Sequence, residues 1–194
     1  MTTSLAALAA EARACTRCVP ELPLGPRPVF QVGETATVLV AAQAPGTRVH
    51  ESGRPFTDPS GDRLRSWMDV DEVTFYDPAR IAILPMGFCY PGRGRSGDLP
   101  PRSECADSWR RHFLERLPDI RLTLVIGQYA RDWHLPASRG RTLTETVRAW
   151  ESYGPAVVPL PHPSPRNNLW LKKNPWFERE VVPALAARVA EALR

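Results

Sequence analysis

The sequence predicts one α/β domain over residues 1–194, a three-layer α/β/α sandwich with a central, mostly parallel four-stranded sheet. A chain of 194 residues fits a single domain of ordinary size. Four short apolar runs alternate with segments of helical pattern, and each run looks buried on both faces, which is typical of a parallel sheet covered by helices. Proline accounts for 21 residues, so rigid turns are frequent and long helices are expected only near the chain ends.

The four strands are expected where short apolar runs occur, because runs of this length fit buried strands better than helices. They are residues 37–42, 80–86, 121–127 and 156–161. Ligands bind beyond the carboxyl ends of the strands in such sheets. We therefore expect the loops 42–46, 87–92 and 162–167 to converge on one cleft.

The helices are expected where composition, amphipathic periodicity or capping residues favour them. They are residues 5–13, 60–68, 103–117, a segment that begins near Gln128, a segment after Thr142, and a C-terminal segment that ends near Leu193. Ser60 is the expected N-cap of the second helix. Thr142 and Glu145 form a capping box. Asn174 as N-cap and Pro175 at the first helical position are expected to open the last helix.

Composition predicts a cytoplasmic, water-soluble chain. No apolar run approaches the ~18 residues of a membrane span, and the N-terminus lacks the positive region of a signal peptide and carries Glu11. The net charge is +4, and Lys172 and Lys173 are the only lysines. Base composition of the genome is one explanation for the arginine bias, and phosphate recognition is the other. Arg93, Arg95, Arg102 and residues 166–173 are expected in proline-rich loops that could follow a phosphate backbone.

The four cysteines fall into two sets. Cys15 and Cys18 form a C-x-x-C pattern, while Cys89 and Cys105 flank a 15-residue loop. A thioredoxin-like dithiol would follow a strand and open a helix, which this pair does not, and a disulfide framework is not expected in a cytosolic chain of this size. Four thiolates could hold an iron–sulfur cluster or a tetrahedral zinc ion. The alternative is four ordinary buried cysteines.

Three further motifs carry both a functional and a structural interpretation. The loop 42–46 could cradle an anion or approach a base with its backbone, or it could be only a tight turn. Phe56 could stack on a base, or it could belong to the core. His162, framed by prolines, could donate a hydrogen bond to charge that develops in a transition state, or it could be structural.

Taken together, these motifs resemble the uracil-DNA glycosylase superfamily, nearest to its iron–sulfur-containing (family four-like) bacterial and archaeal branch. That branch has a Gly-Glu-Ala-Pro-Gly motif, six further residues, Gly-Arg-Pro-Phe, a His-Pro-Ser after its last strand, and cysteines with the spacing found here. The matching segments are Ala42–Gly46, Gly53–Phe56, His162–Ser164, and Cys15, Cys18, Cys89 and Cys105. The resemblance spans about residues 12–177.

The resemblance implies a monomeric DNA repair enzyme that flips a uracil, or another deaminated or damaged base, and hydrolyses its N-glycosidic bond. His162 would stabilise charge on the leaving base, and Gln43 would help to place the attacking water. The base would be bound by Ala44, Gly46, Phe56 and Pro85. The minor groove would be contacted by Pro163, Ser164, Pro165 and Arg166. The cysteines would hold a structural 4Fe-4S cluster, with zinc as the alternative.

The chain departs from the branch at several positions. Gln43 stands where the motif has Glu, and the acidic pair that follows the motif falls at Val49 and His50. Pro85 stands where an Asn reads the edge of uracil, so the excised base stays open. His50, Glu51 and Asp58 are the candidates for activating water. A DNA-binding module without glycosylase activity and an enzyme of small molecules or nucleotides are the alternative functions.

Overall fold

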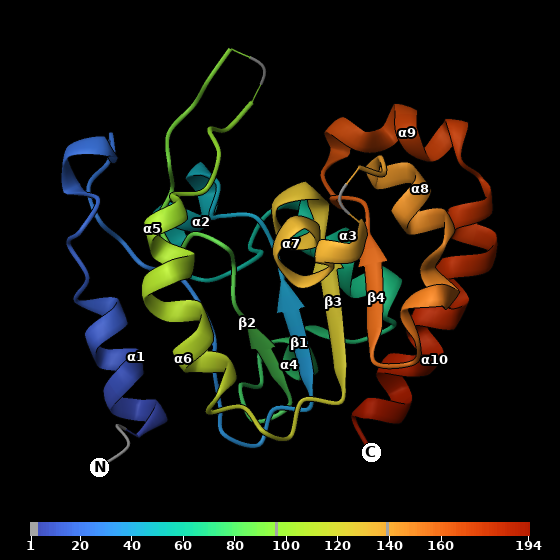
Figure 1. Ribbon diagram of the computed structural model, residues 1–194, viewed down its shortest axis with the longest axis horizontal. Helices are drawn as coiled ribbons and strands as arrows, with labels where there is room; N and C mark the ends of the chain where they lie inside the picture. The colour runs from blue at the N-terminus through green and yellow to red at the C-terminus, as the bar shows by residue number, and fades with distance from the viewer. Residues whose placement is uncertain (1–3, 96, 139) are drawn as a thin grey trace.

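The computed structural model describes residues 4–95, 97–138 and 140–194, and these form an α/β sandwich around one parallel sheet (Figure 1). The sheet has four strands in the order β2-β1-β3-β4. The strands are β1 (Val38–Ala41), β2 (Ile81–Ile83), β3 (Leu122–Ile126) and β4 (Val157–Leu160). Val38 pairs with Ile81 on one side and with Leu122 on the other. The predicted fold class is confirmed.

Proline shapes two of the strands. β2 is shorter than the expected run 80–86 because Pro85, which lacks a backbone N–H, follows it closely. Pro159 lies inside β4, where it pairs in register with Val125. β4 is an edge strand, so the missing N–H of Pro159 can face away from the sheet.

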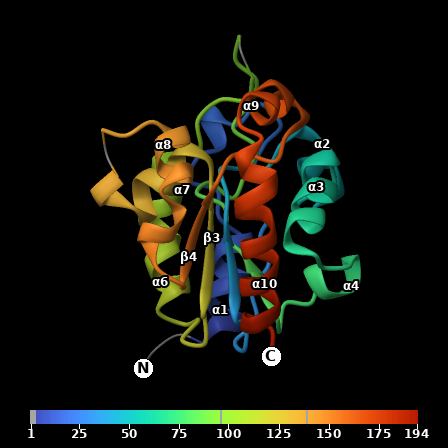
Figure 2. The same cartoon turned by 90° about the vertical axis from the view of Figure 1, so that its right-hand side faces the viewer.

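Helices cover both faces of the sheet, and alternate strand residues point into two separate apolar layers. On one face, Val40 and Leu124 pack in a core with residues of α3 (Pro59–Met68) and α10 (Val182–Ala192). On the other face, Leu39 packs with residues of α1 (Leu5–Arg13) and α6 (Arg111–Leu114). Figure 2 shows α3 and α10 on one side of the strands and α6 on the other.

The remaining helical elements are short. The α-helices are α2 (Thr47–Ser52), α4 (Glu72–Phe75), α5 (Ser103–Cys105), α7 (Gly127–His134), α8 (Leu143–Arg148) and α9 (Asn168–Lys173). The 3₁₀ helices are η1 (Val19–Glu21), η3 (Pro136–Ser138), η4 (Trp150–Tyr153) and η5 (Pro165–Asn167). The π-helical turns are η2 (Ala106–Arg110) and η6 (Phe177–Val181). No helix in the described part of the chain is long and apolar enough to span a bilayer.

Capping explains where several helices begin. The Thr142–Glu145 capping box is confirmed: the Glu145 N–H donates to Thr142 Oγ1 at 3.2 Å, and the Thr142 N–H donates to Glu145 Oε2 at 2.7 Å. The prediction that Ser60 caps α3 is wrong. Asp58 is the N-cap, because its Oδ1 accepts the Gly61 N–H at 3.3 Å and Pro59 fits the first helical position.

Three helical predictions need correction. The expected helix 103–117 is interrupted by η2, directly after Cys105. Residues 166–173 are not a loop, because η5 and α9 occupy them. Asn174 does not cap the last helix: its amide donates to the Trp170 carbonyl and accepts from the Trp176 indole, so it closes α9. α2 and α4 lie in segments for which no helix was predicted.

Candidate active site

A cleft of about 600 Å³ lies beyond the carboxyl ends of the strands. The segments after β1 and β4 line it, together with Pro85 after β2 and the hairpin that holds Gly97 and Asp98. In Figure 1 the four strands point toward the edge from which this hairpin projects. The expected convergence is therefore confirmed for the loops 42–46 and 162–167.

The loop 87–92 does not line this cleft, contrary to the prediction. The N–H groups of Met86 and Gly87 donate to the carbonyls of Ala42 and Gln43 at 2.8 and 3.0 Å, which carries the chain alongside the first motif. Phe88 then packs against Phe30, with ring centroids 4.7 Å apart. This burial turns the following residues toward the α1 side of the sheet.

His162 lies in the cleft and is partly buried. Burial lowers its pKa, while Asp58 and Asp98 act in the opposite direction. The backbone N–H of Ser164 donates to His162 Nδ1 at 3.2 Å. A ring nitrogen that accepts a hydrogen bond carries no proton, so the neutral imidazole holds its proton on Nε2.

Arg63 of α3 holds the loop that follows His162. Its Nη1 donates to the carbonyls of Pro163 and Ser164 at 3.3 and 3.2 Å, and its Nη2 donates to Asn168 Oδ1 at 2.8 Å. The Asn167 amide also donates to the His162 carbonyl at 2.7 Å. The sequence analysis missed Arg63, because nothing local marks a contact between residues 100 positions apart.

Phe56 lines the cleft in a backbone conformation that is unusual for a bulky residue, with φ of 55°. The Tyr76 hydroxyl donates to the carbonyls of Pro55 and Phe56 at 2.9 and 3.0 Å. Gly61 makes room for this turn, since a Cβ at that position would lie 1.8 Å from the Phe56 carbonyl oxygen. Backbone strain held in place by neighbours is typical of functional sites.

The first motif and Pro85 also lie in the cleft. Gln43, Ala44 and Gly46 line it, as predicted for residues of a binding site. Pro85 lines it too, and its carbonyl accepts a hydrogen bond from Nη1 of Arg110 at 3.2 Å. Arg110 is 1% exposed, and burial lowers its pKa to about 9.

Among the described residues, the buried guanidinium of Arg110 donates its hydrogen bonds to backbone carbonyls and an imidazole and pairs with no carboxylate. Nη1 also donates to the Leu84 carbonyl at 2.7 Å, and Nε donates to His134 Nε2 at 3.2 Å. The Arg110 guanidinium lies over the Trp133 ring at 5.1 Å. Burial, followed by the charge of Arg110, lowers the pKa of His134 to about 3, so this imidazole is a neutral acceptor.

Of the three candidates for water activation, only Asp58 lines the cleft within the described residues. Its Oδ2 accepts from the Ser60 hydroxyl at 3.1 Å, and its Oδ1 caps α3. His50 is turned away, with its ring 6.2 Å from that of Tyr90. Burial lowers the pKa of His50. Asp98, which the sequence analysis did not single out, is a second carboxylate in the cleft.

The expected DNA-contacting residues lie at the rim. Ser164, Pro165 and Arg166 line the cleft, whereas Pro163 is buried and does not. Arg166 reaches the hairpin: a Cβ on Gly97 would lie 2.8 Å from its Nη1. Arg93 and Arg95 are exposed on the same hairpin. Arg102 is not free to bind phosphate, because it pairs with Glu104.

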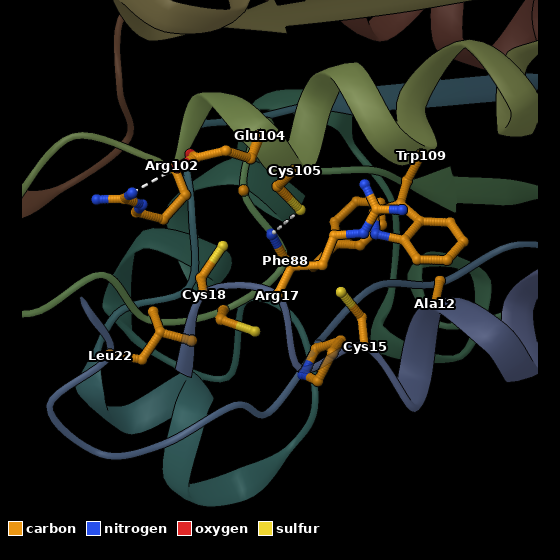
Figure 3. A pocket seen from close by; sticks show the side chains of 13 residues that line it. Ala12, Cys15, Arg17, Cys18, Leu22, Phe88, Arg102, Glu104, Cys105 and Trp109 are labelled. Atoms are coloured by element: carbon orange, nitrogen blue, oxygen red, sulfur yellow. Dashed lines mark hydrogen bonds and ion pairs between the residues drawn. The ribbon is translucent and has the colours of Figure 1, made fainter. Parts of the chain in front are cut away.

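The four cysteines line a second pocket, on the α1 side of the sheet. In Figure 3 the sulfur atoms of Cys15, Cys18 and Cys105 lie around the same interior space. Cys89 is also part of the lining. Burial raises the pKa of Cys89 to about 11 and that of Cys105 to about 12, and the neighbouring thiols add to both shifts. All four are free thiols.

The backbone N–H of Phe88 donates to Cys105 Sγ at 3.3 Å. Arg27 acts to lower the pKa of Cys89, and Arg102 acts to lower that of Cys18, against the larger effect of burial. In the described ranges no group of three or more His, Cys, Asp or Glu side chains is gathered closely enough to hold a metal ion. The thiols thus frame a space rather than converge on one point.

Comparison with known protein families gives one match that covers most of the chain. The model of the uracil DNA glycosylase superfamily matches residues 30–186. This range contains all four strands and every residue that lines the cleft except Val29. It excludes Cys15 and Cys18.

Proposed function

The chain belongs to the uracil DNA glycosylase superfamily, and from that membership we propose that it is a DNA repair enzyme that excises a deaminated or damaged base. Uracil is one candidate base among several. The enzyme flips the nucleotide out of the duplex into the cleft and hydrolyses the bond between C1′ and the base.

The geometry of His162 is the observation that carries this proposal. The Ser164 N–H fixes Nδ1 as an acceptor, and burial lowers the pKa of the ring. His162 therefore enters the reaction as a neutral imidazole with a proton on Nε2. As the glycosidic bond breaks, the base leaves with negative charge, and a prepositioned N–H donor stabilises that charge.

Phe56 and the first motif complete the base pocket in this proposal. Phe56 stacks on the flipped base, and its edge contact with Phe75, with ring centroids 6.0 Å apart, holds the largely buried ring in place. Ala44 and Gly46 contact the base through the backbone, and Gln43 helps to place the water. Ser164, Pro165 and Arg166 enter the minor groove and fill the gap that the flipped base leaves, whereas Pro163 is buried behind them.

The choice of base is not made by a side chain at Pro85. Proline offers no side-chain donor or acceptor there, and Arg110 already binds its carbonyl. These features support a glycosylase that accepts bases other than uracil, hypoxanthine and xanthine included.

The four cysteines are the proposed ligands of a structural 4Fe-4S cluster. The N–H bond from Phe88 to Cys105 is typical of a cluster ligand, because such bonds adjust the potential of a cluster. Arg110 supports the proposal too, because its buried positive charge interacts with Cys105 and lacks a carboxylate partner in the described chain. A tetrahedral zinc ion held by the same four sulfurs is the alternative.

Metal analysis of the purified protein tests this part separately. We expect about four iron atoms per chain and absorption near ~400 nm, both lost in Cys105→Ser. Ser66→Ala, at an exposed position of α3, is the control and should keep the iron. A preparation that contains one zinc ion and no iron after anaerobic purification would show that the cluster assignment is wrong.

Glycosylase activity itself is tested with labelled duplexes that contain uracil, hypoxanthine or xanthine, followed by alkali. Strand breaks that depend on His162, shown by their loss in His162→Ala, are the expected result. The alternative is a DNA-binding module, which the replacement of the usual acidic pair by Val49 and His50 favours. Salt-sensitive binding without breaks on any of the duplexes would establish that alternative.

A further inference from the structure

The first motif lacks the carboxylate that a hydrolytic reaction needs near the sugar. Gln43 is an amide, Val49 is buried, and His50 faces Tyr90 rather than the cleft. Glu51 is exposed and does not line the cleft. Among the described residues, the carboxylates that line it are Asp58 and Asp98.

These two carboxylates differ in the hydrogen bonds that they accept. Both oxygens of Asp58 already accept hydrogen bonds, from Ser60 and from the backbone of Gly61, and these bonds hold the start of α3. Asp98 has neither an ion pair nor a side-chain hydrogen bond with the described residues. Arg166 lies close to the neighbouring Gly97, but within the described part of the chain it forms no ion pair with Asp98. Asp98 is therefore free to bind water.

Asp98 lies beside the first motif. A Cβ placed on Gly46 would be 3.7 Å from Asp98 Oδ2, so the carboxylate faces the backbone turn that opens α2. Burial lowers the pKa of the His162 ring, while Asp58 and, to a smaller extent, Asp98 raise it. Asp98 and His162 thus face the same cleft from separate segments of the chain.

The hairpin holds Asp98 in this position. Arg93 and Asp98 form an antiparallel bridge, and the Leu99 N–H donates to the Gly92 carbonyl at 2.9 Å. Gly97 has φ of 150° and leaves no room for a side chain beneath Arg166. The carboxylate is exposed at the rim, where bound DNA would cover it.

We propose that Asp98 is the carboxylate that orients and deprotonates the attacking water; this inference rests on the proposed glycosylase function. The bond between C1′ and the base breaks, and its electron pair leaves with the base, whose charge His162 stabilises. The water oxygen bonds to C1′ while one water proton passes to Asp98. That proton then returns to solvent, and the departed base takes up one proton from solvent. The negative charge of Asp98 also stabilises the positive charge that develops on the sugar.

The presence of a carboxylate in a cleft for DNA supports this role. Phosphates approach the rim, and an unpaired negative charge there weakens binding. A carboxylate retained at a cost in affinity is expected to contribute to the chemical step instead. Asp98→Asn should therefore separate the two properties: the reaction slows while DNA binding stays equal or tightens.

The test measures single-turnover cleavage and DNA binding for wild type, Asp98→Asn and a matched control. The control is Asp119→Asn, an exposed aspartate away from the cleft. We expect Asp98→Asn to lose about 10²- to 10⁴-fold in rate, with Asp119→Asn unchanged. Binding is measured by anisotropy on a duplex with a stable abasic-site analogue, and should not weaken in either variant. Added formate should restore part of the rate of Asp98→Ala, because it supplies a carboxylate to the vacated space.

Three results would overturn the proposal, and they differ from one another. Wild type that cleaves a base while Asp98→Asn cleaves it at the same rate shows that Asp98 is not the base, and the glycosylase function stands. Wild type that binds DNA and cleaves none of the three bases removes the glycosylase function, and the role of Asp98 with it. A rate loss matched by an equal loss of binding, without rescue by formate, shows a structural role only.

Discussion

Nη1 of Arg110 donates a hydrogen bond to the backbone carbonyl of Pro85 at 3.2 Å. Pro85 lines the cleft, whereas Arg110 ends the π-helical turn that follows Cys105. One buried side chain therefore links the thiol pocket to the floor of the cleft. A π-helical turn is often found where a functional residue must be displaced from regular helical register.

The first prediction concerns this link. Arg110→Met removes the donors of two buried carbonyls, at Leu84 and Pro85, and should lower the free energy of unfolding by about 2–4 kcal/mol. Urea denaturation measures the loss. Arg111→Met, an exposed neighbour, should change stability little. Arg110→Lys keeps the charge but has fewer hydrogen-bond donors, so its free energy of unfolding should lie between those of the other two variants. Equal stability of all three variants would contradict the assigned bonds.

The second prediction concerns the tautomer of His162. Ser164 has φ of −57°, which proline can adopt. Ser164→Pro removes the N–H that holds Nδ1, while Ser164→Ala keeps the N–H and loses only the hydroxyl. We expect ¹⁵N NMR to show the proton shared between both ring nitrogens in Ser164→Pro alone, with glycosylase rate reduced about tenfold by loss of one orienting hydrogen bond. Identical spectra for the two variants would refute the role of this bond.

The third prediction concerns the approach of α3 to Phe56. In Gly61→Ala the new methyl group would lie 1.8 Å from the Phe56 carbonyl oxygen. The backbone must shift, and we expect a loss of more than about 2 kcal/mol in the free energy of unfolding. Ser66→Ala on the same helix is the control, because Ser66 is exposed. Thermal unfolding of both variants decides the matter, and a Gly61→Ala protein as stable as wild type would show that the close contact is not real.

The fourth prediction concerns stability in acid. The pKa of His134 is about 3 in the folded protein, against 6.5 for an ordinary histidine. Between these values the unfolded chain binds a proton that the folded chain does not, so stability falls as pH falls from 6.5 toward 3. At pH ~5 this amounts to about 2 kcal/mol. His134→Gln should remove that part of the pH dependence in urea titrations, and His112→Gln at an exposed site is the control; an unchanged slope in His134→Gln would contradict the prediction.

Local sequence patterns were sufficient to predict the architecture of the fold. Apolar runs located the four strands, and capping residues located α8. Two strand-end loops met in the cleft as expected, because parallel strands bring their carboxyl ends to one edge. Boundaries were less accurate: Asp58 rather than Ser60 caps α3, since Pro59 occupies the first helical position.

Side chains that act over long sequence distances were not predictable. Arg63 bonds to Pro163, and Arg110 bonds to Pro85, with nothing near either arginine to indicate a partner. Asp98 stands in a segment rich in glycine and proline that indicated only a loop. Its place in the cleft depends on how the hairpin folds back toward Gly46, which is a tertiary relationship.

The cysteines of the thiol pocket come from two separate parts of the chain, and this affects how the protein would unfold. Cys89 and Cys105 belong to the framework that the family match covers, whereas Cys15 and Cys18 lie before it. Besides this pocket, the first segment is held by the apolar side of α1, where Leu5, Leu8, Ala9 and Ala12 are buried. The N-terminal segment is thus held by the thiol pocket, by the apolar contacts of α1 and by the hydrogen bond from Arg17 to Ser108 at 2.7 Å. If the contacts in the thiol pocket were lost, the N-terminal segment would detach first near Cys18. The cleft residues would still be held by Arg63 and Tyr76.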